Sequence, residues 1–259
     1  MTEKEYKELE EVVRLLRKEC PWDRIQTNDS IKEATLEEAY EVVEAIDQKD
    51  YDELKKELGD LLLHVIFHSV IAEEMKKFTL AEVINLEKEK LIRRHPHVFG
   101  NVEVQDHHEV KQNWEKIKLT EGRNSVLDGL PNELPALQKA QRIQEKVAKI
   151  GFEWTTKEQA FKKIEEEIYE LKEAIQKNQI EEIEDELGDL LFSLVNFARL
   201  HNINAETALR KANKKFIKRF QYIEEKLKTE EKDIKNLSVD ELLSLWKQTK
   251  NIENLDKND

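Results

Sequence analysis

The chain is poor in helix breakers and in cysteine. Its 259 residues include six glycines, four prolines and one cysteine, Cys20. One cysteine excludes an internal disulfide and is typical of a reducing compartment. So few glycines and prolines, together with abundant Glu, Lys and Leu, favour long helices. Alternating β-branched runs are nearly absent, so the composition predicts an all-α protein.

Long apolar runs and a positive net charge are missing as well. No stretch approaches the roughly 18 apolar residues that a membrane-spanning helix needs. The first residues show no basic segment followed by an apolar run, so no secretory signal is expected. The 43 basic and 56 acidic side chains give a formal charge of -13, which would repel nucleic acid and anionic membranes. We therefore expect a cytoplasmic protein with no nucleic-acid or membrane partner.

Apolar residues recur at intervals of three and four along most of the chain, which is the spacing of one helix face. Asp128-Gly129-Leu130-Pro131 consists mostly of residue types that favour a turn, which indicates a linker. We therefore divide the chain into an N-terminal helical domain at 1–120, a linker at 121–135 and a C-terminal helical domain at 136–259. The predicted helices cover residues 3–19, 34–48, 51–75, 79–94, 107–119, 136–149, 157–177, 179–200, 204–230 and 238–250.

An acidic motif, EExxE followed by ExxD, occurs twice at the same spacing. The first copy is Glu37-Glu38-Ala39-Tyr40-Glu41 with Glu57-Leu58-Gly59-Asp60. Adding 129 to each number gives the second copy, Glu166-Glu167-Ile168-Tyr169-Glu170 with Glu186-Leu187-Gly188-Asp189. The segment between the two helices differs between the copies, whereas the acidic positions are identical. A merely solvated helix face would tolerate Lys or Gln there, so the identity favours a function.

These carboxylates have the spacing of a magnesium site. Residues three apart share one helix face, so each copy presents two pairs that converge if its two helices pack antiparallel. Mg²⁺ prefers oxygen ligands and retains water, which leaves positions for phosphate oxygens. Magnesium in turn implies a substrate that carries phosphate. The predicted ligands are Glu167, Glu170, Glu186 and Asp189 in the second copy and Glu38, Glu41, Glu57 and Asp60 in the first.

Basic and aromatic residues repeat as well. Lys and Arg suit phosphate, and Trp can stack on a base; a solvated basic face and a core-packing Trp are the alternatives. Trp22 also matches Trp154. The repeated candidates for nucleotide binding are Lys215, Arg219, Trp246 and Lys250 in the second copy, and Lys90, Arg94, Trp114 and Lys118 in the first.

Two further features of the acidic helices admit a structural or a functional explanation. Gly59 and Gly188 precede the motif aspartate inside a helix, at a cost of roughly 1 kcal/mol relative to alanine, which suggests that a backbone or a ligand passes close by. His64 and His68 have the i, i+4 spacing of zinc ligands. Ser193 occupies the position in the second copy that matches His64, and the helix is apolar there, so core packing is favoured.

Together these motifs resemble the all-α nucleoside triphosphate pyrophosphohydrolases, and in detail the MazG family. The resemblance implies helical bundles that are completed by dimerisation, hence a homodimer. It also implies hydrolysis of NTPs and dNTPs to the monophosphate and pyrophosphate with broad base tolerance, dependent on two or more Mg²⁺ per active site. It covers nearly the whole chain and is carried by Cys20-Pro21-Trp22-Asp23, Glu57-Leu58-Gly59-Asp60-Leu61-Leu62, Arg93-Arg94-His95-Pro96-His97-Val98-Phe99, Gly151-Phe152-Glu153-Trp154-Thr155 and Glu186-Leu187-Gly188-Asp189-Leu190-Leu191-Phe192.

The resemblance also implies roles for individual residues. In such proteins the C-terminal copy is usually the active one, and Lys163 in that copy corresponds to Ala34 in the first. Glu166 or Glu167 is the candidate for orienting or deprotonating the attacking water. The implied metal ligands are Glu167, Glu170, Glu186 and Asp189, which together with Glu166 form the candidate catalytic set. The implied nucleotide contacts are Lys163, Lys215, Arg219, Trp246 and Lys250.

Two other functions fit the same residues. Related all-α bundles hydrolyse only dUTP or dCTP, and a nucleotide-sensing module that has lost catalysis would retain the same pocket. A carboxylate-bridged di-iron bundle is disfavoured, because such sites use Glu-x-x-His and here the third residue on is Glu or Asp.

Overall fold

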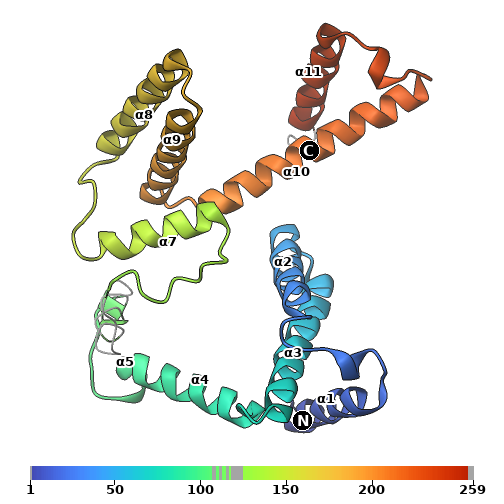
Figure 1. The fold of residues 1–259 in the computed structure, drawn as a ribbon, viewed down its shortest axis with the longest axis vertical. Helices are drawn as coiled ribbons and strands as arrows, with labels where there is room; N and C mark the ends of the chain where they lie inside the picture. The colour runs from blue at the N-terminus through green and yellow to red at the C-terminus, as the bar shows by residue number, and fades with distance from the viewer. Residues whose placement is uncertain (1, 107–108, 111–112, 115–116, 118–124, 256–259) are drawn as a thin grey trace. The chain divides into compact units, whose positions relative to one another are not determined.

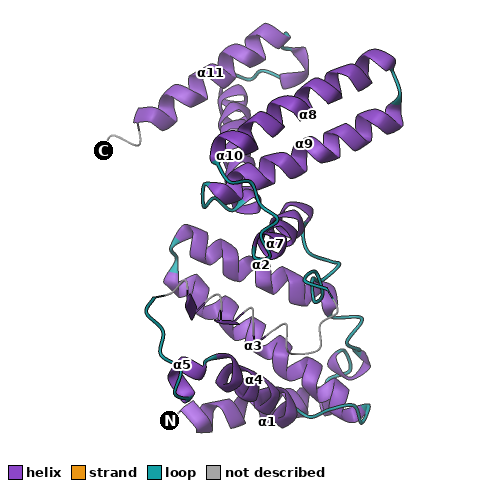
Figure 2. Ribbon diagram, turned by 90° about the vertical axis from the view of Figure 1, so that its left-hand side faces the viewer, coloured by secondary structure: helices purple, strands orange, loops and turns teal. Residues whose placement is uncertain are grey.

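The computed structural model describes residues 2–106, 109–110, 113–114, 117 and 125–255. Every regular element within these residues is a helix, as the two ribbon views show (Figures 1 and 2). None of the described helices is long and apolar enough to cross a membrane. The chain divides into two compact units, Met1–Glu121 and Gly122–Asp259.

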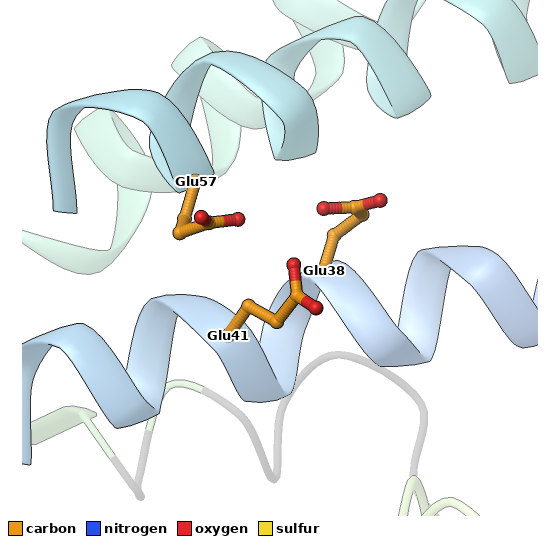
Figure 3. Close-up of side chains that lie close together, drawn as sticks. All are labelled: Glu38, Glu41 and Glu57. Carbon is orange, nitrogen blue, oxygen red and sulfur yellow. The ribbon is translucent and has the colours of Figure 1, made fainter. Parts of the chain in front are cut away.

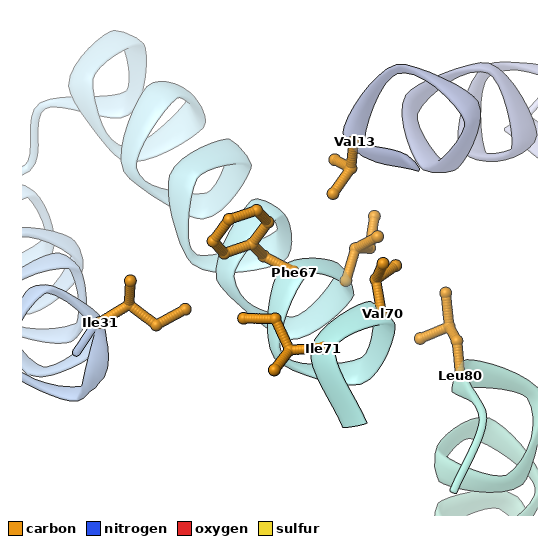
Figure 4. Close-up of a cluster of buried hydrophobic side chains, with 7 residues drawn as sticks. Val13, Ile31, Phe67, Val70, Ile71 and Leu80 are labelled. Atoms are coloured by element: carbon orange, nitrogen blue, oxygen red, sulfur yellow. The ribbon is translucent and has the colours of Figure 1, made fainter. Parts of the chain in front are cut away.

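The first unit has its core around the second half of one long helix, α3. Ile66, Phe67 and Ile71 of α3 pack against Val13 of α1 and Ile31, which precedes α2 (Figure 4). Ion pairs from two arginines of α1 to glutamates at the end of α3 reinforce this contact. The elements of this unit are α1 (Thr2–Glu19), η1 (Asp23–Ile25), α2 (Lys32–Gln48), α3 (Tyr51–Glu74), α4 (Leu80–Arg94) and α5 (Pro96–Phe99).

The second unit is held together by α7, which packs against α9 and α10. Gln144 of α7 is buried, and its Nε2 donates to the Phe192 carbonyl of α9 at 2.8 Å. Gln141 accepts from the first backbone N–H of α10, that of Ala205, at 3.2 Å. The elements of this unit are α7 (Ala136–Ala148), α8 (Lys157–Lys177), α9 (Ile180–Leu200), α10 (Ala205–Thr229), η2 (Ile234–Asn236) and α11 (Val239–Leu255).

The two acidic motifs lie on matching helical hairpins. α2 packs along α3, and α8 packs along α9, with connections of only two residues. Both first helices end at a residue in the left-handed region, Lys49 with φ 58° and Asn178 with φ 55°. Asp50 then caps α3 by accepting from two backbone N–H groups. A connection this short forces the helices to run antiparallel, as the repeated motif requires.

The predicted all-α fold with two tandem helical copies is confirmed, and most helix limits agree within two residues. The short α5 was not predicted; Pro96 at its first position suits a helix start, because its missing N–H would be unpaired there. α11 continues to Leu255, five residues beyond the predicted end. The predicted helix at 107–119 falls largely on residues outside those described.

Candidate functional site

In the first unit, the hairpin brings three of the four predicted ligands together. Oxygens of Glu38 and Glu41 on α2 and of Glu57 on α3 lie within 4.8 Å of one another (Figure 3). The fourth, Asp60, is exposed and lies outside this group. Burial, followed by the charges of Glu41 and Asp60, raises the pKa of Glu38. A concentration of unbalanced negative charge of this kind is what a divalent cation relieves.

Glu57 is the most perturbed member of this cluster. It is only 8% exposed. Burial, with the neighbouring carboxylate of Glu41 next in importance, raises its pKa from 4.5 to about 7. Both effects penalise the ionised form, so near neutral pH the Glu57 carboxyl of the metal-free cluster is partly protonated.

In the second unit, three predicted ligands also converge, although not the same three. Oxygens of Glu167, Glu186 and Asp189 lie within 4.8 Å of one another. Glu170 lies outside this group, and burial together with the charge of Glu167 outweighs the nearby Lys163 and raises its pKa. Glu167 is 3% exposed, and its buried Oε2 has no hydrogen-bond partner among the described residues. A buried carboxylate oxygen without a donor is a position that a metal ion fits.

Lys163 distinguishes this cluster from the first one. Its Nζ lies 2.7 Å from Glu166 Oε1 and 2.8 Å from Glu167 Oε1. These two bonds raise the Lys163 pKa above its ordinary value. One helical turn separates Lys163 from Glu167, so α8 itself sets the contact. Ala34 stands at the matching position of α2, so the N-terminal cluster has no ammonium there.

Apart from Lys163 on α8, the predicted nucleotide contacts of the second unit lie on α10 and α11. Arg219 of α10 lies over the Trp246 ring of α11, with Cζ 5.5 Å from its centroid. Phe216 contacts the same ring, with centroids 4.9 Å apart. Lys215 is exposed on α10, and the side chain of Lys250 is outside the described part of the structure. Figure 1 shows α11 beside α10, away from α8 and α9, so the carboxylates and Trp246 form separate clusters within this unit.

The matching residues of the first unit are placed less regularly. Lys90 pairs with Glu87 one turn earlier on α4, and Arg94 is the last residue of that helix. The Trp114 ring meets His95 edge-on, with centroids 5.0 Å apart. Lys118 lies outside the described residues.

Comparison with known proteins agrees with the duplicated geometry. The MazG nucleotide pyrophosphohydrolase domain matches the chain twice, over residues 26–99 and 155–223. The chain belongs to the MazG family. Each match contains one carboxylate cluster and its Lys–Arg pair, whereas Trp114 and Trp246 lie beyond the matched residues.

Several relatives carry names that describe an activity, and three of them illustrate the range of similarity. A nucleoside triphosphate pyrophosphohydrolase/pyrophosphatase MazG of Thermotoga maritima is 44% identical over 250 residues, which is 95% of each chain. A nucleoside triphosphate pyrophosphohydrolase of Escherichia coli K12 is 40% identical over 239 residues, covering 89% of this chain and 90% of the relative. A Mycobacterium tuberculosis protein of the same name is 38% identical over 139 residues, covering 52% of this chain and 42% of the relative.

A hydrogen-bonded chain behind the N-terminal MazG cluster was not predicted. Thr35 Oγ1 lies 2.8 Å from His64 Nδ1 and 2.8 Å from His68 Nε2. His68 Nδ1 continues the chain to Asn28 Oδ1 at 2.8 Å. At the other end, His64 Nε2 lies 3.9 Å from Glu38 Oε1. The two histidines are therefore partly buried polar groups that support the cluster, rather than apolar core residues.

The glycines of the two MazG motifs face open space. A methyl group added at Gly59 or Gly188 would meet no atom within 4 Å, apart from the helix itself and adjacent residues. The expectation that a backbone passes close to them is therefore not met within the described part of this chain. Space of this kind remains available to a ligand or to another subunit.

Proposed function

We propose that this MazG-family enzyme hydrolyses nucleoside triphosphates to the monophosphate and pyrophosphate in a Mg²⁺-dependent reaction. The names of its relatives support the reaction. The observation that carries the metal dependence is Glu167, whose buried Oε2 lacks a donor within the described structure while its neighbours Glu186 and Asp189 converge on it. The one ammonium paired with Glu167, that of Lys163, does not balance three converging carboxylates, and buried charge that stays unbalanced is unfavourable.

In this proposal Glu167, Glu186 and Asp189, with Glu170 at the margin, hold two or more Mg²⁺ in the C-terminal unit. Bound Mg²⁺ would neutralise phosphate charge and lower the pKa of a water molecule. Glu166 is exposed and shares Lys163 with Glu167, so either carboxylate can orient the attacking water or take its proton.

The cations and tryptophan of the same unit would hold the nucleotide. Lys163, Lys215 and Arg219, together with Lys250, offset the charge of the triphosphate. Trp246 stacks on the base, and stacking tolerates all bases because each has a π-face. This supports activity on nucleoside triphosphates that carry different bases.

The central test replaces Glu186 by alanine. We expect Glu186→Ala to abolish nearly all pyrophosphate release while the circular dichroism spectrum stays helical. Glu184→Ala is the matched control, because it removes the same charge from an exposed position of α9. Activity of Glu186→Ala within a fewfold of wild type would refute the assignment.

A second test compares the two copies. The Ala34–Lys163 difference favours catalysis in the C-terminal unit, so Glu167→Ala should lose activity and Glu38→Ala should retain most of it. Equal losses would mean that both clusters contribute to turnover.

Two narrower functions are distinguished by product analysis. Turnover of dUTP or dCTP alone, among the eight common nucleotides, would replace broad tolerance with a restricted pyrophosphatase. Nucleotide recovered intact after long incubation with Mg²⁺ would favour a binding module.

We also propose a homodimer. Leu187, Leu191 and Leu194 form a stripe on α9 with 43–46% of each residue exposed. Their counterparts on α3 are exposed as well. A stripe at i, i+4 and i+7 is the buried face of an amphipathic helix, so a second hairpin would complete each bundle. Sedimentation should show a dimer that Leu191→Glu dissociates; a monomeric wild type would exclude it.

A further inference from the structure

Lys163 occupies one of the two oxygens that Glu167 offers. Its Nζ lies 2.8 Å from Glu167 Oε1, whereas Oε2 of the same carboxylate is buried and receives no hydrogen bond from the part of the chain that the structure describes. The second bond, to Glu166 at 2.7 Å, anchors the ammonium within one turn of its own helix. The C-terminal cluster therefore contains a built-in cation.

A cation in this position opposes metal binding. A divalent ion at Glu167 brings two positive charges next to the ammonium, and like charges at this distance repel strongly where burial reduces screening. Glu167 is 3% exposed, so solvent screens the repulsion poorly. Lys163 has four rotatable side-chain bonds and is itself partly exposed, so it can turn away from Glu167 while retaining Glu166.

We propose that Lys163 couples metal binding to substrate binding in the C-terminal unit. In the nucleotide-free protein it holds Glu167 and weakens metal binding. When a metal ion takes Glu167, the displaced ammonium binds a phosphate oxygen of the nucleotide. Metal and nucleotide thereby strengthen each other's binding. This inference rests on the function proposed above and adds a positioning role for Lys163 that a simple phosphate contact lacks.

The N-terminal cluster provides an internal comparison. Ala34 matches Lys163, and Glu38 faces the imidazole of His64 instead. No lysine at this position competes with a metal ion there. The N-terminal cluster should therefore bind a divalent cation without help from nucleotide.

The test measures binding of Mn²⁺, as a probe for Mg²⁺, by the loss of its free electron paramagnetic resonance signal. The full chain carries Glu57→Gln, which disables the N-terminal cluster. Lys163→Met removes the charge and keeps the length of the side chain. We expect Lys163→Met to tighten nucleotide-free Mn²⁺ binding about five- to tenfold, a typical coupling factor. Lys162→Met, at the exposed neighbouring lysine, should change it less than twofold.

The second measurement adds a nucleotide with a methylene group between the α- and β-phosphorus atoms. In the Lys163-containing protein this analogue should raise Mn²⁺ affinity by a larger factor than in Lys163→Met. By reciprocity, Mn²⁺ should raise the affinity for the analogue by the same factor. The reverse exchange, Ala34→Lys in a Glu186→Gln background, should weaken Mn²⁺ binding at the N-terminal cluster.

The possible results separate the two proposals. If Mn²⁺ does not bind the C-terminal cluster, with or without the analogue, the proposed function itself fails. If Mn²⁺ binds but Lys163→Met leaves nucleotide-free affinity unchanged or weaker, the coupling role is overturned and Lys163 is only a phosphate contact. Lys163→Gln repeats the measurement in case the methionine variant does not fold.

Discussion

Replacing Thr35 by valine isolates the polar chain behind the N-terminal cluster. Valine has nearly the shape of threonine but no hydroxyl group. That hydroxyl donates to the Ile31 carbonyl at 3.0 Å and lies 2.8 Å from a nitrogen of each of two histidines. A hydroxyl has one donor and two acceptor positions, so these three contacts use its full capacity.

The expected cost follows from the groups that lose their partner. Each buried polar group left unsatisfied costs about 1–3 kcal/mol. His64 and His68 both lose a bond, whereas the Ile31 carbonyl keeps its backbone bond to the Thr35 N–H. The His64 side chain is 13% exposed, so water replaces part of the loss. We expect about 2–3 kcal/mol of destabilisation, or a shift of roughly 10 °C for a unit of this size.

Calorimetry and urea denaturation should locate this loss in the transition of the N-terminal unit and leave the other transition in place. Thr229→Val is the matched control, because Thr229 also donates to a carbonyl one turn back, that of Glu225. It is exposed and contacts no histidine in the described structure, so its loss should stay below about 0.5 kcal/mol. A Thr35→Val protein as stable as this control would refute the structural role of the chain.

Three further predictions concern single positions. The Glu57 pKa is raised from 4.5 to about 7, so between these pH values the folded protein retains a proton that the unfolded chain loses, and the stability from this group falls as pH rises. Metal-free Glu57→Gln should therefore lose less stability between pH 5 and 8 than the wild type does. Identical pH profiles of the two proteins in urea denaturation would contradict this. Gly188→Ala should raise the free energy of unfolding by about 0.5–1 kcal/mol, because an added methyl meets no described atom within 4 Å beyond its own helix and its chain neighbours. A loss instead would show that another subunit or a ligand fills this space. Lys49→Gly should stabilise the first hairpin by about 1 kcal/mol in thermal unfolding, because Lys49 has φ 58°. Asn178→Gly should increase stability less, since Asn tolerates this backbone region better. Equal increases for the two variants would argue against backbone strain at Lys49.

The hairpins were predictable from the sequence because the repeat of the α-helix determines which residues share a face. Motif residues three apart share a helix face wherever the helix forms, and a two-residue connection leaves only an antiparallel arrangement. Which three carboxylates converge was beyond that reasoning. Asp60 lies outside the first group and Glu170 outside the second, and the convergence of carboxylate oxygens depends on side-chain rotamers, which the residue spacing does not define.

The Thr35 chain shows a different limit. His64 and His68 follow Thr35 by 29 and 33 residues in the sequence, so these contacts depend on the register between α2 and α3. The spacing of His64 and His68 suggested either zinc binding or core packing. Neither interpretation considered a hydrogen bond to a hydroxyl group on the facing helix. The available signal was Thr35 itself, which stands three residues before Glu38 on the same helix face and matches the apolar Ile164 of the second copy.

The two units neutralise the negative charge of their converging carboxylates in different ways. Carboxylates that the hairpin forces together must lose negative charge when no metal is bound. The N-terminal cluster does so with a proton, because burial and Glu41 raise the Glu57 pKa to about 7. The C-terminal cluster does so with the ammonium of Lys163. Metal binding must therefore release a proton in the first unit, so its affinity should rise with pH up to about 7. In the second unit it displaces a lysine that keeps its charge, and that charge becomes available to a phosphate.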